Sequence, residues 1–306
     1  MRNAKLQAWL YAFRLRTLPL AFSSIITGSS IAFAHNRENF NWIVFVLCLV
    51  TTLFLQVLSN LANDYGDSEK GTDNDERIGP KRAIQAGMLS VQEIKVGIAL
   101  TTGFSLIAGV ALVHEAFLNV EHDYTFFFLL LGFAAMAAAI KYTVGKSAYG
   151  YSGWGDAFVI LFFGIVGVGG SYYLLSHQID YTVLLPALSI GFFSAGVLNL
   201  NNMRDSQSDA KAGKNTLAVK LGLDKARVYH RLLIVAGMLL SVAYVLVSFV
   251  STMQFLFIIT APLFRKHLVA VNRVKELKDF DPLLKQLAIS TFIFSLLFAL
   301  GQVLGE

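Results

Sequence analysis

The sequence of 306 residues contains only one cysteine, Cys48. A single thiol excludes an internal disulfide and a metal site built from cysteine ligands. Charged residues are also scarce, since Asp, Glu, Lys and Arg make up 15% of the chain while apolar residues make up 55%. This balance excludes an ordinary soluble protein and predicts a protein with several membrane-spanning helices.

Runs without charged residues show where the spans are expected. Most of these runs are close to the roughly 20 residues that a helix needs to cross a bilayer. They cover residues 17–36, 39–63, 96–114, 124–140, 157–179, 181–203, 232–264 and 286–305. The first run follows Arg14 and Arg16, and we expect it to be a retained helix rather than a cleaved signal peptide.

The run at 232–264 is too long for one span, and it has a polar break at residues 248–254. Splitting it there, and continuing its second helix to about residue 271, predicts nine helices. With a cytoplasmic N-terminus and an external C-terminus, every lysine and arginine except Arg37 then lies inside, as the positive-inside rule requires. A single helix would instead place the basic residues between Arg265 and Lys285 outside.

We therefore expect an all-α, polytopic bundle of nine transmembrane helices in a bacterial cytoplasmic membrane, with residues 1–306 forming one membrane-embedded domain. The formal net charge of +5 reflects the basic cytoplasmic face, which attracts anionic lipid or phosphate. It is not a sign of nucleic-acid binding.

A polar cluster closes the second apolar run. Asn63 and Asp67 are four residues apart, so on a helix they share a face, and Asp64 and Asp73 add two more carboxylates. Carboxylate and amide oxygens at this density favour a hard cation, and Mg²⁺ fits because it needs few protein ligands. The alternative is a solvated acidic loop after a helix.

A second cluster repeats the pattern and favours the metal interpretation. Asn201, Asp205 and Asp209 are again spaced by four residues, and they too end an apolar run. Two such faces at the ends of two membrane-length helices indicate paired metal sites that face one polyanion. A diphosphate is the obvious candidate, because Mg²⁺ bridges its oxygens and offsets its charge.

Basic residues follow each cluster. Arg77, Lys81 and Arg82 come after the first, and Lys214 comes after the second. Acids that hold a metal and cations that bind phosphate oxygens are the parts that a metal–diphosphate complex needs. Topology signalling by the same basic residues is the alternative.

Asp156 stands at the expected start of a membrane helix, next to aromatic residues. It could simply cap that helix, because the N-terminal dipole tolerates an anion. It could also orient the hydroxyl group of an aromatic acceptor. The sequence leaves both interpretations open.

A transporter or channel is the rival from another functional class, because acids in membrane helices also mark ion pathways. Transport predicts acids near the middle of the membrane. Here the acids lie at helix ends on one face, and each group is followed by a basic loop. This arrangement favours an enzyme.

Several motifs together resemble the UbiA superfamily of intramembrane aromatic prenyltransferases, and within it the branch that acts on 1,4-dihydroxy-2-naphthoate. The matching stretches are Arg16-Thr-Leu-Pro19, Asn63-Asp-Tyr-Gly-Asp67 with Gly71 and Asp73, Arg77-Ile-Gly-Pro80, Tyr142-Thr-Val-Gly145, Gly153-Trp-Gly-Asp156, Asn201-Asn-Met-Arg-Asp205 and Gly213-Lys-Asn-Thr216-Leu-Ala. Gly71 stands where many members of the superfamily have a third aspartate, and Asp73 lies two residues further on.

The resemblance implies that both aspartate motifs bind Mg²⁺ and the diphosphate of a polyprenyl donor, with Asn63 and Asn201 among the contacts. It also matches Tyr142 and Lys146 to a Tyr-xxx-Lys loop of the family. The implied reaction joins an allylic chain to an aromatic ring, with Asp67, Asp205, Asp156 and Tyr142 as the catalytic candidates. 4-Hydroxybenzoate and homogentisate are the alternative acceptors within the same class.

Overall fold

The structure is a computed structural model that describes residues 2–73, 78–118, 120 and 124–305, and every regular element in that part of the chain is a helix. The α-helices are α1 (Arg2–Phe13), α2 (Leu18–His35), α3 (Trp42–Glu69), α4 (Val91–Phe117), α5 (Thr125–Lys141), α6 (Gly155–Val159), α7 (Gly170–Ser176), α8 (Leu184–Arg204), α9 (Ser206–Lys211), α10 (Leu217–Leu221), α11 (Leu223–Val247), α12 (Ala261–Arg273) and α13 (Asp281–Gly305). Shorter 3₁₀ segments cover Leu15–Thr17, Tyr149–Tyr151, Tyr181–Val183, Thr252–Thr260 and Leu277–Phe280, and Ile160–Gly169 is a π-helix. The predicted all-α fold is confirmed.

Eight helical stretches in the described part of the chain are long and apolar enough to cross a membrane. They are Ala4–His35, Trp42–Glu69, Val91–Phe117, Gly155–Ser176, Tyr181–Arg204, Leu223–Val247, Thr252–Arg273 and Leu277–Gly305. The apolar helix Thr125–Lys141 is shorter, at 17 residues. The chain is therefore a polytopic membrane protein, while the count of nine crossings and the orientation of the two ends stay predictions.

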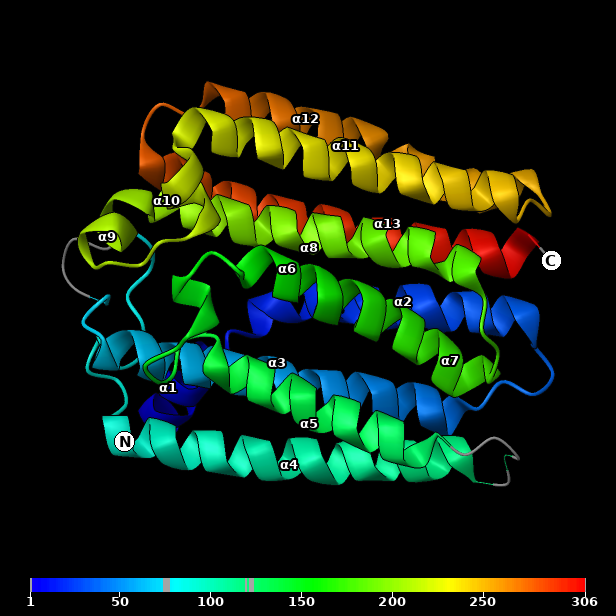
Figure 1. The fold of residues 1–306 in the computed structure, drawn as a ribbon, viewed down its shortest axis with the longest axis horizontal. Coiled ribbons are helices and arrows are strands. Elements are labelled where there is room, and N and C mark those ends of the chain that lie inside the picture. Colours follow the sequence, from blue (N-terminus) through cyan, green and yellow to red (C-terminus); the bar gives the residue numbers. More distant parts are fainter. Residues whose placement is uncertain (1, 74–77, 119, 121–123, 306) are drawn as a thin grey trace.

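The long helices lie side by side, and the chain passes back and forth between the two ends of the bundle (Figure 1). The short helices α1, α9 and α10 lie at one end, whereas α13 finishes at the opposite end (Figure 1). The last turns of α3 and α8, which carry the two acidic motifs, point to the end that holds α9 and α10 (Figure 1). Both motifs are thereby brought to one end of the bundle.

The predicted break in the long apolar run is confirmed. Helix α11 ends at Val247, and a new helical segment begins at Thr252. The side chain of Gln254 causes this interruption, because its Oε1 accepts hydrogen bonds from the backbone N–H groups of Val250 at 2.7 Å and Ser251 at 3.3 Å. The Ser251 hydroxyl in turn accepts from the N–H of Met253 at 3.2 Å. These polar contacts cap the new segment and let the chain reverse.

A close contact between two backbones holds the π-helical segment after α6 against α8. A Cβ atom built on Gly164, in the π-helical segment after α6, would lie 2.5 Å from the carbonyl oxygen of Ala187 on α8. Gly191 on α8 faces the same segment, and its own Cβ would lie 3.1 Å from the carbonyl of Ile160. Only glycine permits this approach of two backbones, which is a common device in membrane helices.

Candidate active site

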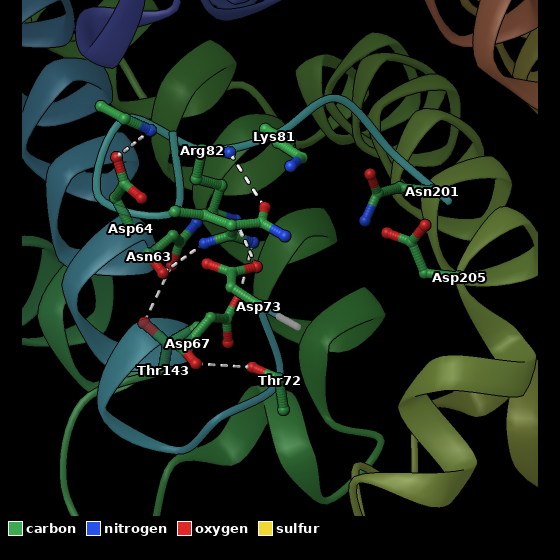
Figure 2. Close-up of polar contacts among 12 residues, drawn as sticks. Asn63, Asp64, Asp67, Thr72, Asp73, Lys81, Arg82, Thr143, Asn201 and Asp205 are labelled. Carbon is green, nitrogen blue, oxygen red and sulfur yellow. Dashed lines mark hydrogen bonds and ion pairs between the residues drawn. The ribbon is translucent and has the colours of Figure 1, made fainter. Parts of the chain in front are cut away.

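Asn63, Asp64 and Asp67 of the first acidic motif lie in the last two turns of α3, and Asp73 follows the helix. A single arginine contacts several of these residues. Arg82, from the loop before α4, forms ion pairs with Asp67 and with Asp73, the latter at 3.1 Å, and it donates to the carbonyl of Asn63 (Figure 2). Asp67 and Arg82 are both buried. Burial opposes the charge of Arg82, but Asp67, Asp73 and Asp64 raise its pKa above its ordinary value. The guanidinium is therefore a permanent cation inside the motif.

Asp64 contacts the loop that carries Arg82, and its assignment as a metal ligand stays a prediction. Its Oδ2 accepts a hydrogen bond from the backbone N–H of Ala83 at 3.1 Å, which ties the loop of Arg82 to α3. Its Oδ1 is buried and has no hydrogen-bond partner among the described residues. The carboxylate thus fixes the path of the loop that places Arg82 over Asp67.

Asn63 faces the loop after α5. The hydroxyl of Thr143 donates to the carbonyl of Ala62 at 3.0 Å and lies 3.2 Å from Oδ1 of Asn63. Gly66 permits this approach, because a Cβ atom there would lie 2.6 Å from Oγ1 of Thr143. The loop after α5 is therefore held directly against the first motif.

Arg204, at the end of α8, contacts the residues of the second motif in the same way. Its Nε and Nη2 donate to the two carboxylate oxygens of Asp205 at 2.8 and 2.7 Å, and Nη2 also donates to Oδ1 of Asn201 at 2.8 Å. Its Nη1 reaches Asp281, the first residue of α13, at 2.5 Å. Arg204 and Asp205 are both buried, so the pair is shielded from solvent.

Asp209 lies on α9, one turn beyond Asp205, and pairs with Lys214 at 3.5 Å. Burial raises the pKa of Asp209 to about 6; Lys214 opposes the shift, and the carboxylates of Asp205 and Asp67 add to it. Asp67 belongs to the first motif. The contact of Gly79 with Arg204 and the hydrogen bonds of Tyr151 to Asp67 and Asn215 bring the two motifs close together.

The loop before Arg82 approaches the second motif as well. A Cβ atom at Gly79 would lie 2.5 Å from Nη2 of Arg204. Lys81, which is exposed, lies on the same loop as it runs from the Arg82 cluster toward Asn201 and Asp205 (Figure 2). One loop thus passes over both motifs.

Tyr151 contacts residues of both motifs. Its position could not be predicted from the sequence. Its hydroxyl donates to Oδ1 of Asp67 at 2.6 Å. The ammonium group of Lys70 lies 3.9 Å from the centre of its ring, and that of Lys214 lies 5.3 Å away. Its carbonyl accepts from the N–H of Asn215 at 3.0 Å, on the loop of the second motif.

The two remaining catalytic candidates lie beside this cluster. Tyr142 follows α5, and burial raises the pKa of its hydroxyl well above the ordinary value, with Asp156 and Asp67 adding to the shift. Asp156 is buried in the first turn of α6, and both of its carboxylate oxygens lack a hydrogen-bond partner in the described part of the chain. An unpartnered buried carboxylate is costly unless a ligand engages it.

Two predicted substrate contacts are not tested by the structure. Lys146 is exposed on the loop after α5. Arg77 lies outside the described residues. Their assignments stay predictions.

Three residues that hold the site together were missed at the level of sequence. They are Lys70, Tyr151 and Arg204. Lys70 and Arg204 lie within the two acidic motifs, so their position in the sequence was a usable signal, whereas Tyr151 resembled an interfacial aromatic residue.

The carboxylate and amide oxygens of the two motifs are ligands of the type that Mg²⁺ prefers. Within the described residues, no three Asp, Glu, His or Cys side chains lie close enough together to hold a metal ion. Mg²⁺ does not require such a group, because it binds through one or two carboxylates and fills its other positions with water and substrate phosphates. Oδ2 of Asp209 is buried and lacks a hydrogen-bond partner in the described part of the chain. A metal would share these carboxylates with Arg82, Arg204 and Lys214.

Two acidic motifs at one end of a membrane bundle, each paired with basic residues, define the class of membrane enzymes that bind a metal–diphosphate complex. The UbiA prenyltransferase family matches residues 21–300. The chain belongs to the UbiA prenyltransferase family.

Relatives of known name extend over the whole chain. It is 46% identical to the 1,4-dihydroxy-2-naphthoate octaprenyltransferase of Haemophilus influenzae, over 100% of this chain and 98% of that protein. It is 41% identical to the Escherichia coli protein of the same name, over 99% and 97%.

Solved structures share the fold at low identity. A UbiA homolog from Aeropyrum pernix superposes with a TM-score of 0.66 at 17% identity, covering 92% of this chain and 98% of that one. A UbiA homolog from Archaeoglobus fulgidus bound to GPP and Mg²⁺ gives a TM-score of 0.65 at 18% identity, covering 95% and 98%. The fold of the bundle is therefore that of the family.

Proposed function

We propose that the chain transfers a polyprenyl group from polyprenyl diphosphate to 1,4-dihydroxy-2-naphthoate, with Mg²⁺ as cofactor and with loss of the acceptor's carboxylate as CO₂. The immediate product is the reduced, hydroquinone form of demethylmenaquinone, because the transfer involves no oxidant. Residues 1–306 act as one membrane-embedded domain in a bacterial cytoplasmic membrane.

The observation that carries this proposal is the meeting of the two acidic motifs. Tyr151 donates a hydrogen bond to Asp67 of the first motif and accepts one from the N–H of Asn215 on the loop of the second. Lys214 pairs with Asp209 and lies over the ring of Tyr151. A diphosphate has enough negative charge to engage the metal ions and basic residues of both motifs at once. The naphthoate acceptor is supported by the full-length relatives, which share that name at 46% and 41% identity.

Asp67 would hold one Mg²⁺ with the amide oxygen of Asn63 beside it. Asp205 and Asp209 would hold a second, with the amide oxygen of Asn201 beside them. Asp73 shares Arg82 with Asp67 and would join the first site when that arginine moves. When bound, Mg²⁺ supplies positive charge that stabilises the departing diphosphate. Asp64 would hold the loop of Arg82.

The basic residues would bind the phosphate oxygens. Arg82 and Lys214 already lie beside carboxylates of the two motifs, and Lys81 lies on the loop that spans them (Figure 2). Hydrogen bonds from such cations to phosphate are short and strong. They become stronger as the C–O bond of the donor breaks and the electron pair leaves with the diphosphate, so they favour the transition state.

The acceptor ring would lie beside Asp156 and Tyr142. The unpartnered carboxylate of Asp156 accepts a hydrogen bond from a ring hydroxyl and makes the ring more nucleophilic. Tyr142 remains protonated, because burial raises its pKa, so its hydroxyl can donate a hydrogen bond to the acceptor. The ring carbon that bears the carboxylate forms the new bond to the allylic carbon. Release of CO₂ then returns the bonding electrons to the ring, so that carbon needs no base.

The acceptor can be tested directly with carboxyl-labelled 1,4-dihydroxy-2-naphthoate and a polyprenyl diphosphate. The expected result is one labelled CO₂ for each prenyl group transferred, and no turnover of 4-hydroxybenzoate or homogentisate. Prenylation of 4-hydroxybenzoate without turnover of the naphthoate would overturn the acceptor and leave the metal–diphosphate site standing.

A further inference from the structure

Tyr151 makes more contacts to the two acidic motifs than packing alone requires. Its hydroxyl lies 2.6 Å from Oδ1 of Asp67 and 2.9 Å from Oγ1 of Thr72, which itself lies 2.9 Å from the carbonyl of Asp67. An ionised carboxylate can only accept, so the hydrogen of Tyr151 goes to Asp67.

The ring of Tyr151 faces lysines of both motifs, and its backbone contacts the loop of the second motif. Lys70 follows the last turn of α3, and Lys214 follows α9, yet both ammonium groups lie over this one ring, at 3.9 and 5.3 Å from its centre. Cations are attracted to the face of an aromatic ring at such distances. The hydrogen bond from the N–H of Asn215 to the Tyr151 carbonyl, at 3.0 Å, fixes the second loop to the same residue.

We propose that Tyr151 is a positioning residue that joins the two motifs: its hydroxyl orients the carboxylate of Asp67 for the metal, and its ring holds Lys70 and Lys214 for the donor diphosphate. This inference rests on the proposed function. Groups that hydrogen-bond a metal ligand fix its direction, and their loss typically weakens metal binding by about 10- to 100-fold. Tyr151 would act through Asp67 and the two lysines, without touching the reacting atoms.

The chain offers a matched control in the same 3₁₀ turn. Tyr149 also uses its hydroxyl, which donates to the carbonyl of Ala138 at 2.8 Å, and its ring stacks on Phe158 with centres 4.0 Å apart. Tyr149→Phe therefore removes a comparable partly buried hydrogen bond that does not reach the acids. Any general loosening of the turn would affect this variant as well.

The test measures Mn²⁺ binding to the purified full-length chain by electron paramagnetic resonance, with inorganic diphosphate in place of the donor, because Mn²⁺ suits the same oxygen ligands and substrate phosphates complete the coordination of such a metal. We expect Tyr151→Phe to raise the Kd for Mn²⁺ by about 10-fold or more, and Tyr149→Phe to leave it unchanged. A Tyr151→Phe variant that binds Mn²⁺ like the wild type would overturn the inference, and so would equal weakening in the two variants. A wild-type chain that binds no Mn²⁺ would overturn the proposed function itself.

A second measurement isolates the ring. At saturating metal, Tyr151→Phe keeps the ring and should keep the KM for the polyprenyl diphosphate, whereas Tyr151→Leu should raise that KM by about threefold or more. Equal KM values for the Phe and Leu variants would show that the ring does not position the lysines. Both variants are compared at the same saturating concentration of the acceptor.

Discussion

The carboxylate of Asp64 accepts a hydrogen bond from the backbone N–H of Ala83 at 3.1 Å, and this bond anchors the loop that carries Arg82. Asp64 lies one turn from Asp67 on α3, so it could act as an anchor for this loop, as a metal ligand, or as both. The distinction between an anchor and a metal ligand can be tested by substitution.

We predict that Asp64→Asn retains most of the activity, because the amide oxygen can still accept from Ala83. Asp64→Ala should lose stability by about 1–3 kcal/mol, since it leaves a buried N–H without a partner, and it should lose activity with it. Melting temperature and turnover of the two variants are measured together. Loss of Mn²⁺ binding in a well-folded Asp64→Asn variant would instead identify Asp64 as a ligand.

We predict that Arg204→Ala is strongly destabilising. Its partner Asp205 is buried, and removing one member of a buried ion pair typically costs about 3–5 kcal/mol. The control is Lys278→Ala, which breaks the pair with Glu276, whose side chains are 69% and 65% exposed. Exposed pairs contribute little, so the control should melt with the wild type. Equal melting temperatures for both variants would contradict the role given to Arg204.

We predict that the end of the bundle with the acidic motifs faces the cytoplasm. Met88 and Ile179 are 45% and 69% exposed and lie on connections at opposite ends, between α3 and α4 and between α7 and α8. Cys48 is buried, so single introduced cysteines can be labelled selectively. Met88→Cys should react with an impermeant reagent only from the cytoplasm, and Ile179→Cys only from outside. Reaction of both from the same side would overturn the predicted topology.

The sequence predicted the parts of the site that depend on helical spacing. Asn63 and Asp67, and likewise Asn201 and Asp205, lie where two membrane-length helices end, and the polar residues around Gln254 interrupt a third run. These features are local, because a helix repeats its face every three or four residues and a polar side chain can cap the helix that follows it.

The parts that escaped prediction depend on the paths of loops. The bond between Asp64 and Ala83 joins residues 19 apart, and the bond between Tyr151 and Asp67 joins residues 84 apart. Neither pair has a periodic signal. The pairing of Arg204 with Asp205 is local, but its extension to Asp281 requires α13 to begin beside the end of α8. Sequence spacing could therefore identify the acids and not the residues that hold them.

The most direct test of the central claim follows Mg²⁺-dependent release of labelled CO₂ from carboxyl-labelled 1,4-dihydroxy-2-naphthoate in the presence of a polyprenyl diphosphate. We predict release by the wild type that stops when Mg²⁺ is chelated and returns when it is restored. Asp67→Ala and Asp205→Ala should be less stable, because each leaves a buried arginine without one of its partners. The folded fraction should release almost none, because it lacks a carboxylate that the metal–diphosphate complex needs. A correctly folded Asp67→Ala variant with near-normal release at saturating Mg²⁺ would contradict the account.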